Sequence, residues 1–283
     1  MEFKRVRTDE RALDAYASLF RTCFPTANHL DKKYLTWLYA DNPAGRVVGF
    51  DAYDEGRLAA HYSCIPADLT LNGKMARGLL SLNTATHPDF QGRGLFTKLA
   101  AMTYDAGKDE GFACVYGIAN ANSTPGFVRK LEFQLVRPLE ARIGLGRVPV
   151  SWEHVGERTG FARNWTEETF RWRCANPKNP LSARENGAGG VVVYGAAMGR
   201  MISAYGEAPV SLASGGLPKP RWSPLKLFLG LIPNDVGGYG GFVSIPNRLR
   251  PSPLNLIFRS LGGGRKDLDP TKVLLSFMDF DAY

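Results

Sequence analysis

A long stretch of strand-like sequence between residues 46 and 87 constrains the fold more than any other feature. Apolar and polar residues alternate with a period of two from Arg46 to Tyr53 and again from Leu58 to Ile65, around a turn at residues 54–56. Asn72-Gly73 then predicts a two-residue hairpin, because both residues tolerate a positive φ. A third strand is expected from Ala76 to His87. Together these segments predict an antiparallel meander of three strands.

Segments with helical spacing flank this meander. After a short opening strand at residues 3–6, Thr8 is expected to cap a helix whose apolar residues run from Ala12 to Phe20. A second helix is expected from Asp31 to Ala40, and Asn42-Pro43 ends it. After the meander we expect, in order, a helix from residue 95, a strand at 112–119, a short helix ending at Leu131 and a strand from Phe133. This order predicts a mixed α+β fold.

Composition narrows the functional class. The 283 residues carry a formal net charge of +8, which favours an anionic partner such as a nucleotide-bearing small molecule, a nucleic acid or a membrane surface. The basic residues are dispersed and form no run of five, so we expect no direct nucleic-acid binding. No stretch of eighteen apolar residues occurs, and the first residues do not resemble a signal peptide, so a cytoplasmic protein without a membrane span is expected.

The cysteines give no sign of a metal site or a disulfide framework. Cys23, Cys64, Cys114 and Cys174 are widely spaced, with no C-x-x-C pair and no histidine close to any of them in sequence. We therefore expect neither a bound metal nor structural disulfides.

Three pairs of segments suggest an internal repeat. Residues 35–43 resemble residues 170–177, since both end a helix at Asn-Pro. The hairpin at 47–62 resembles 191–205, and residues 118–131 resemble 245–261. Three echoes in the same order predict two tandem modules, residues 1–145 and residues 146–283, with chance similarity as the alternative.

A glycine-containing loop follows the meander. Gln91-Gly92-Arg93-Gly94 lies between the third strand and a helix, so its backbone N–H groups and the positive end of the helix dipole would suit a pyrophosphate. The loop contains neither the G-x-x-x-x-G-K-[ST] string nor a G-x-G-x-x-G fingerprint. An ordinary strand-to-helix turn that uses glycine for its geometry is the alternative.

The segment Gln91-Gly92-Arg93-Gly94-Leu95-Phe96, preceded by His87-Pro88-Asp89-Phe90, resembles the Q/R-x-x-G-x-G/A loop of the GNAT superfamily of acyl-CoA-dependent N-acyltransferases. The order of elements over residues 1–143 agrees with that family, and the second half is related to it only through the internal repeat. Phe96 departs from the pattern, which ends in a small residue. The resemblance implies a twisted, mostly antiparallel sheet flanked by helices.

The resemblance also implies a co-substrate, acetyl-CoA or another short acyl-CoA. The residues that would contact pantetheine are Asn83, Thr84, Ala85 and Thr86. Those that would hold the pyrophosphate are Gln91, Gly92, Arg93, Gly94 and Leu95. Asn120 or Asn122 would lie beside the cofactor at the end of the next strand.

The family chemistry is direct attack of a neutral amine on the thioester, which needs a base, an oxyanion-stabilising N–H and a proton for the leaving thiolate. Many members use the tyrosine of a Tyr-x-x-x-Gly-Phe pattern as the acid. When the pattern is aligned on Phe133, Val128 replaces this tyrosine and Glu132 replaces the glycine.

Other residues are therefore candidates for the proton transfers. Tyr116, Ser123 or water could supply the proton to the thiolate. His61 is a candidate base, with a half-buried strand residue that makes one hydrogen bond as the alternative; Asp51 and Glu140 are further candidates.

The resulting prediction is an N-acyltransferase with an active N-terminal module. The second module has Lys219–Pro224 in place of the phosphate loop, without its glycines, and is expected to shape the acceptor site or a homodimer interface. The Trp37–Pro43 helix end and the Thr86–Phe90 lead-in look most similar to the branch associated with surface-polysaccharide clusters, which implies a nucleotide-linked amino sugar as acceptor. The alternatives are an amino acid, polyamine or protein amine as acceptor, or a catalytically silent acyl-CoA-binding module.

Overall fold

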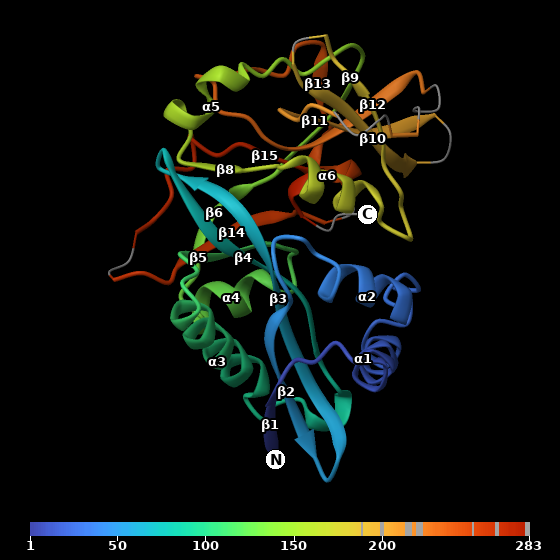
Figure 1. Ribbon diagram of the computed structural model, residues 1–283, viewed down its shortest axis with the longest axis vertical. Coiled ribbons are helices and arrows are strands. Elements are labelled where there is room, and N and C mark those ends of the chain that lie inside the picture. Colours follow the sequence, from blue (N-terminus) through green and yellow to red (C-terminus); the bar gives the residue numbers. More distant parts are fainter. Residues whose placement is uncertain are drawn as a thin grey trace.

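The chain folds into two β-sheets with helices around them (Figure 1). The computed structural model describes residues 1–187, 189–198, 201–212, 217–218, 223–250, 252–263 and 266–280. In Figure 1 the sheet built mostly from the first half lies below, and the sheet built mostly from the second half lies above it. The expected mixed α+β class is confirmed.

The N-terminal sheet has eight strands within the described residues. Its order is β1-β2-β3-β4-β5-β14-β6, and β8 pairs with β3 at one end. The strands are β1 (Glu2–Arg5), β2 (Val48–Asp54), β3 (Arg57–Leu71), β4 (Lys74–Thr86), β5 (Cys114–Ala119), β6 (Gln134–Pro138), β8 (Phe161–Arg163) and β14 (Asn255–Ser260). Neighbouring strands run antiparallel except β4 and β5, which are parallel.

Helices cover both faces of this sheet (Figure 1). On one face lie α1 (Glu10–Cys23) and α2 (Lys32–Tyr39), and on the other α3 (Leu95–Asp109) and α4 (Thr124–Lys130). The side chain of Asp9, rather than the expected Thr8, caps α1 by accepting a hydrogen bond from the N–H of Ala12. This places the apolar stripe of α1 against the sheet.

The predicted meander is confirmed, with one difference. Asn72 and Gly73 form the hairpin turn with φ values of +49° and +76°. The second strand, expected from Leu58 to Ile65, extends from Arg57 to Leu71, because β3 keeps its pairing with β4 across Pro66. The hairpin reaches the second half of the chain, where Leu69–Leu71 pair with β8.

The second sheet repeats the strand order of the first. Its order is β13-β7-β12-β11-β10-β9, and β15 pairs with β12. Its strands are β7 (Glu140–Gly144), β9 (Ser182–Glu185), β10 (Val191–Met198), β11 (Ile202–Ala208), β12 (Leu225–Leu231), β13 (Phe242–Ser244) and β15 (Leu275–Ser276). β11 and β12 are its parallel pair, as β4 and β5 are in the first sheet. The strands β9 to β12 therefore correspond to β2 to β5.

Each half of the chain contributes strands to the other sheet: β7 joins the second sheet, and β8 and β14 join the first. β14 lies between β5 and β6 in the N-terminal sheet (Figure 1), and β7 takes the corresponding place between β12 and β13 in the second sheet. The backbone N–H of Leu139 donates to the carbonyl of Leu254, just before β7 and β14 begin. A division at residue 145 therefore does not separate the two sheets, because β7 precedes it but belongs to the second sheet, whereas β8 and β14 follow it but belong to the first.

A symmetric contact joins α2 to α6 (Glu167–Cys174). The indole N–H of Trp37 donates to the carbonyl of Trp172 at 2.9 Å, and the indole N–H of Trp172 donates to the carbonyl of Trp37 at the same distance. The two rings stack with centroids 4.9 Å apart. Reciprocal contacts of this kind are what a twofold relation between two equivalent units produces.

The other two sequence similarities, 47–62 with 191–205 and 118–131 with 245–261, do not relate equivalent elements. By position in the sheets, the hairpin β10–β11 corresponds to β3–β4 rather than to β2–β3. Residues 255–260 form a strand, whereas residues 124–130 form a helix. Short apolar runs resemble one another in many strands and helices, so these two similarities were misleading.

The remaining elements are short. They are α5 (Trp152–Arg158) and the 3-10 turns η1 (Pro88–Phe90), η2 (Asn247–Leu249) and η3 (Phe277–Asp279). All four cysteines are free. Among the described helices, none has the length and apolar character needed to span a bilayer.

Candidate functional site

The parallel strands β4 and β5 separate halfway along the N-terminal sheet. They pair from Gly78 and Cys114 to Leu80 and Tyr116, and then continue to Thr86 and Ala119 without pairing with each other. Diverging strands leave backbone N–H and C=O groups free on their facing edges. An extended ligand can use these groups in place of a neighbouring strand.

A bulge in β4 accompanies this separation. Ser63 pairs with Leu82 and His61 with Ala85, so Asn83 and Thr84 together lie opposite Tyr62. Asn83 adopts a left-handed φ of +49°. The bulge turns the backbone of β4 immediately before the glycine-containing loop.

The loop itself ends at an uncapped helix. Gly92 and Gly94 have φ values of +75° and +72°, a region that favours glycine. Gly94 is the N-cap of α3 and provides no side-chain hydrogen bond to the helix. The N–H groups of the first turn are thus available to a ligand, and the helix dipole favours an anion there.

These features surround a cavity of about 540 Å³. Its lining residues come from the end of α1, the end of β4, the loop, the start of α3 and the end of α4. They are Thr22, Cys23, Phe24, Thr84, Ala85, Thr86, Pro88, Phe90, Gln91, Gly92, Arg93, Gly94, Leu95, Phe96, Thr97 and Lys130. Two cations and no carboxylate occur among these described lining residues, so the cavity is electrostatically suited to an anionic ligand.

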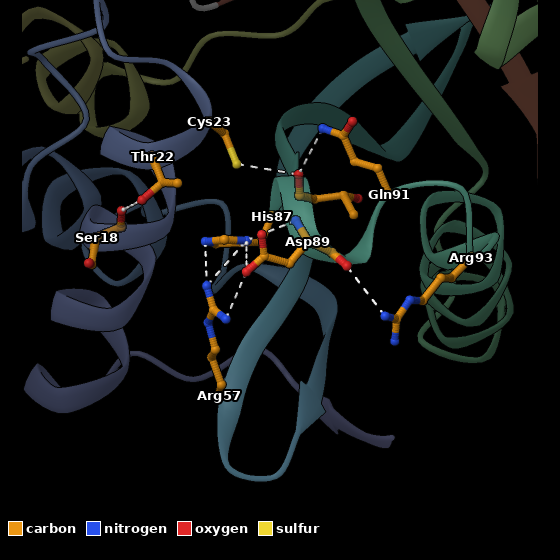
Figure 2. A network of polar contacts seen from close by, with 9 residues as sticks. Ser18, Thr22, Cys23, Arg57, His87, Asp89, Gln91 and Arg93 are labelled. Atoms are coloured by element: carbon orange, nitrogen blue, oxygen red, sulfur yellow. Dashed lines mark hydrogen bonds and ion pairs between the residues drawn. The ribbon is translucent and has the colours of Figure 1, made fainter.

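Figure 2 shows the polar contacts that hold the loop. Arg57 reaches from the start of β3 to His87 and Asp89, at 2.7 Å from the imidazole Nε2 and 2.9 Å from the carboxylate. The carbonyl of Thr86 accepts hydrogen bonds from the side chains of Gln91 and Cys23. Burial raises the pKa of the Cys23 thiol, which favours its role as a neutral donor.

Phe96, the departure from the family pattern, is accommodated by the opposite helix. Its ring lies 5.4 Å from that of Phe127, and a Cβ at Gly126 would lie 3.4 Å from it. At the other end of α4, Glu132 has a left-handed φ of +56°, the conformation for which glycine would be favoured. The structure thus supports the alignment that puts Val128 in place of the usual tyrosine.

Most of the predicted cofactor-binding residues meet at the cavity. Of the expected set, Thr84, Ala85, Thr86 and Gln91 to Leu95 line it. Asn83, Asn120 and Asn122 are not among its described lining residues. The side chain of Asn120 instead accepts hydrogen bonds from the N–H groups of Asn122 and Ser123, and so fixes the turn before α4.

His61 does not reach the cavity. It is fully buried, with Nδ1 2.7 Å from the carboxylate of Asp51 and Nε2 3.0 Å from the hydroxyl of Tyr39. Tyr16 donates to the second oxygen of Asp51, and Tyr39 also contacts Ser63. Burial raises the pKa of both Tyr16 and Tyr39, which keeps them protonated. Because both ring nitrogens have partners in the core, the geometry does not support direct contact between His61 and an amine.

The two candidate acids also lie elsewhere. Tyr116 is fully buried and donates to the backbone carbonyl of Asp279, at the junction with the C-terminal segment. Ser123 exchanges hydrogen bonds with Asn120 at the start of α4 and does not line the cavity. Strand alternation could not reveal that Tyr116 faces the second half of the chain, because that contact joins residues 163 positions apart.

Comparison with known proteins identifies the family that the first half of the chain matches. A protein family described as "Acetyltransferase (GNAT) domain" matches residues 4–136, which include the meander, the loop and α3. Residues 4–136 are a GNAT acetyltransferase domain. The expected superfamily and an N-acyltransferase enzyme are thereby confirmed, whereas the narrower surface-polysaccharide branch finds no support.

Solved structures extend the likeness beyond the GNAT domain. A GCN5-related N-acetyltransferase from Anabaena variabilis aligns over 92% of this chain and 73% of its own, with a TM-score of 0.62 and 10% identity. One from Kribbella flavida aligns over 92% and 71%, with a TM-score of 0.58 and 13% identity. Eis1 from Mycobacterium abscessus aligns over 92% and 74%, with a TM-score of 0.56 and 12% identity. At these identities the likeness shows the fold, which is GNAT-like across both sheets. No curated protein sequence matches the chain.

Proposed function

We propose that the chain transfers an acetyl or another short acyl group from acyl-CoA to a primary amine. The cavity at the divergence of β4 and β5 carries this proposal, because it combines free strand edges with an uncapped helix N-terminus. The diphosphate would contact the backbone from Gln91 to Leu95, with Arg93 and Lys130 adding positive charge. The pantetheine arm would extend along Thr84–Thr86.

The chemistry proposed is a direct transfer. The neutral amine attacks the thioester carbonyl carbon, the C–N bond forms, and the C–S bond breaks with release of the thiolate. The ionisable side chains among the described lining residues are Cys23, Arg93 and Lys130, and they include no carboxylate or imidazole that could act as a general base. We therefore propose that water removes the ammonium proton and protonates the thiolate, in place of His61, Tyr116 or Ser123.

We further propose that the second sheet is a degenerate GNAT-like module that binds no CoA. β11 and β12 pair only from Ile202 and Leu225 to Tyr205 and Phe228. Beyond this point β12 pairs with β15, and a Cβ at Gly206 would lie 3.1 Å from the ring of Phe277. The chain's own residues 275–277 thus fill the space that corresponds to the cavity between β4 and β5. The segment at 219–222, expected to replace the phosphate loop, lies outside the described residues.

The proposed acceptor class rests on the net charge of the chain. The net charge of +8 favours an anionic acceptor, and a nucleotide-linked amino sugar is the class to test first. The absence of the usual tyrosine at Val128 supports the competing proposal of a silent acyl-CoA-binding module. These proposals differ in turnover, since a silent module would bind CoA without releasing free thiol in the presence of any amine.

Thermal unfolding with a ligand panel tests the proposal. A ligand at 100 times its Kd that binds only the folded state adds about 2.7 kcal/mol to the free energy of unfolding. We expect acetyl-CoA to raise the unfolding midpoint and NAD to leave it unchanged. A second shift with a nucleotide amino sugar, and not with amino acids or polyamines, would support the acceptor class. The proposed function is wrong if no CoA compound shifts the midpoint.

The Gly94→Trp variant tests the position of the diphosphate. We expect its Kd for acetyl-CoA to rise by at least about 100-fold, which equals about 2.7 kcal/mol, because the indole would occupy the space in front of the α3 N-terminus. Gly111→Trp is a matched control, since Gly111 follows the other end of α3 with a φ of +82° and no atom near its Cβ position. Both variants carry the same backbone strain. Calorimetric titration showing unchanged affinity in Gly94→Trp would contradict the site.

A further inference from the structure

We propose that Arg57 is a positioning residue for the diphosphate loop. It fixes residues 87–90, which lead into the loop, and it neutralises Asp89, the only acidic residue between His87 and Thr97. This inference rests on the proposed function, because it concerns the affinity of the same site for CoA. Arg57 does not line the cavity, so its effect on the ligand must pass through these neighbours.

The contacts of Arg57 join two parts of the chain that are thirty residues apart. Its guanidinium lies 2.9 Å from the carboxylate of Asp89 and 2.7 Å from Nε2 of His87 (Figure 2). The same group lies 5.4 Å from the centre of the Phe90 ring. One side chain on β3 thus contacts three of the four lead-in residues.

Arg93 connects the glycine-containing loop to Asp89 and Phe90. Arg93 donates to the backbone carbonyl of Asp89 at 3.4 Å, and its guanidinium lies 5.0 Å from the ring centre of Phe90. Since Arg93 lies between Gly92 and Gly94, a displacement of Asp89 or Phe90 would be transmitted to the N–H groups that face the diphosphate. Holding such groups in their binding geometry before the ligand arrives raises affinity without adding a contact.

Charge gives Arg57 a second effect. Asp89 precedes Gly92 by three residues, and an unpaired carboxylate there would repel a diphosphate. Both partners of the Arg57–Asp89 pair are more than half exposed, at 53% and 59%, so the pair contributes little to folding. Loss of Arg57 is therefore expected to raise the Kd for CoA while leaving the unfolding midpoint nearly unchanged.

The test compares Arg57→Ala with Arg5→Ala in the full chain. Arg5 is a matched control, because its side chain is 54% exposed, pairs with Glu110 at 2.5 Å and lies 5.2 Å from the ring of Phe50, away from the loop. By calorimetric titration at low ionic strength we expect Arg57→Ala to raise the Kd for CoA about fivefold. Arg5→Ala should change it by less than about twofold. Binding of pantetheine, which lacks the diphosphate, should be unchanged in both variants.

Two further variants separate positioning from a general structural effect. Asp89→Asn in the Arg57→Ala background should restore only part of the lost affinity, since it removes the repelling charge but does not restore the lost positioning. Arg57→Lys should give an intermediate Kd, because a lysine can pair with Asp89 but lacks the fork that also reaches His87. If wild-type protein does not bind CoA, the proposed function itself fails. If it does, the inference is overturned by an unchanged Kd in Arg57→Ala, by equal losses for CoA and pantetheine, or by full recovery with Asp89→Asn, which would leave only charge neutralisation.

Discussion

A chain that ends at Leu145 is expected not to fold into a stable domain, although residues 4–136 contain the whole match to the GNAT family. Truncation removes β14, which pairs with β5 from Asn255 to Ser260 and with β6 on its other side. Leu256, Ile257 and Phe258 are at most 4% exposed, and each buried side chain of this size is worth about 2–5 kcal/mol. Their loss approaches the whole stability of a typical domain, about 5–15 kcal/mol.

The truncated chain cannot replace β14 with its own β7. A single residue, Leu139, separates β6 from β7, whereas the common tight hairpins need at least two loop residues. The measurement is the thermal unfolding curve of residues 1–145 by circular dichroism, beside that of the full chain. A matched fragment that adds residues 254–261 through a flexible linker should recover a cooperative transition. A cooperative transition in the unlinked fragment would show that the strand exchange is dispensable.

The second large effect is expected at His61, as a loss of stability. In His61→Ala the carboxylate of Asp51, which is fully buried, keeps Tyr16 but loses the imidazole at 2.7 Å. Leaving a buried polar group without one of its hydrogen-bond partners costs about 1–3 kcal/mol, and the cavity left by the imidazole adds to this cost. Urea unfolding should therefore show a much lower midpoint for His61→Ala. His154→Ala serves as a control, since His154 is 40% exposed and lies 3.9 Å from Glu153, and it should change stability by less than about 0.5 kcal/mol.

A double variant sharpens the test. Asp51→Ala combined with His61→Ala leaves neither member of the pair without its partner, so the two changes together should cost less than the sum of the single changes. The alternative, in which His61 is the general base, predicts the opposite behaviour. It would be supported if His61→Ala kept its stability and lost only the rate of acyl transfer.

Several features of the site follow from local sequence alone. The turn at Asn72-Gly73 and the loop glycines at 92 and 94 adopt positive φ values, which asparagine and glycine tolerate better than other residues. Gln91 to Leu95 line the cavity because a strand, two glycines and an apolar helix follow one another directly. Such features depend on residues a few positions apart, and these interactions are the ones that periodicity and turn chemistry report.

The roles of single polar residues were harder to predict. His61 and Asp51 lie on neighbouring strands, and alternation alone cannot say whether their shared face meets a cleft or the helix α1. The structure places Tyr16 and Tyr39, from two helices, against them and closes that face. Strand alternation likewise could not show which surroundings Tyr116 has; in the structure its hydroxyl donates to the carbonyl of Asp279 in the C-terminal segment.

The mixed fold, the meander, the glycine-containing loop and the helix that begins at Leu95 could all be predicted from the sequence, because local backbone preferences and apolar spacing specify each of them. Three arrangements could not be predicted: β7 and β14 exchange sheets, residues 275–277 lie where β11 and β12 diverge, and Arg57 reaches Asp89. These arrangements depend on pairing between residues far apart in the chain. Many strands share the same alternating pattern, so the pattern does not identify a strand's partner.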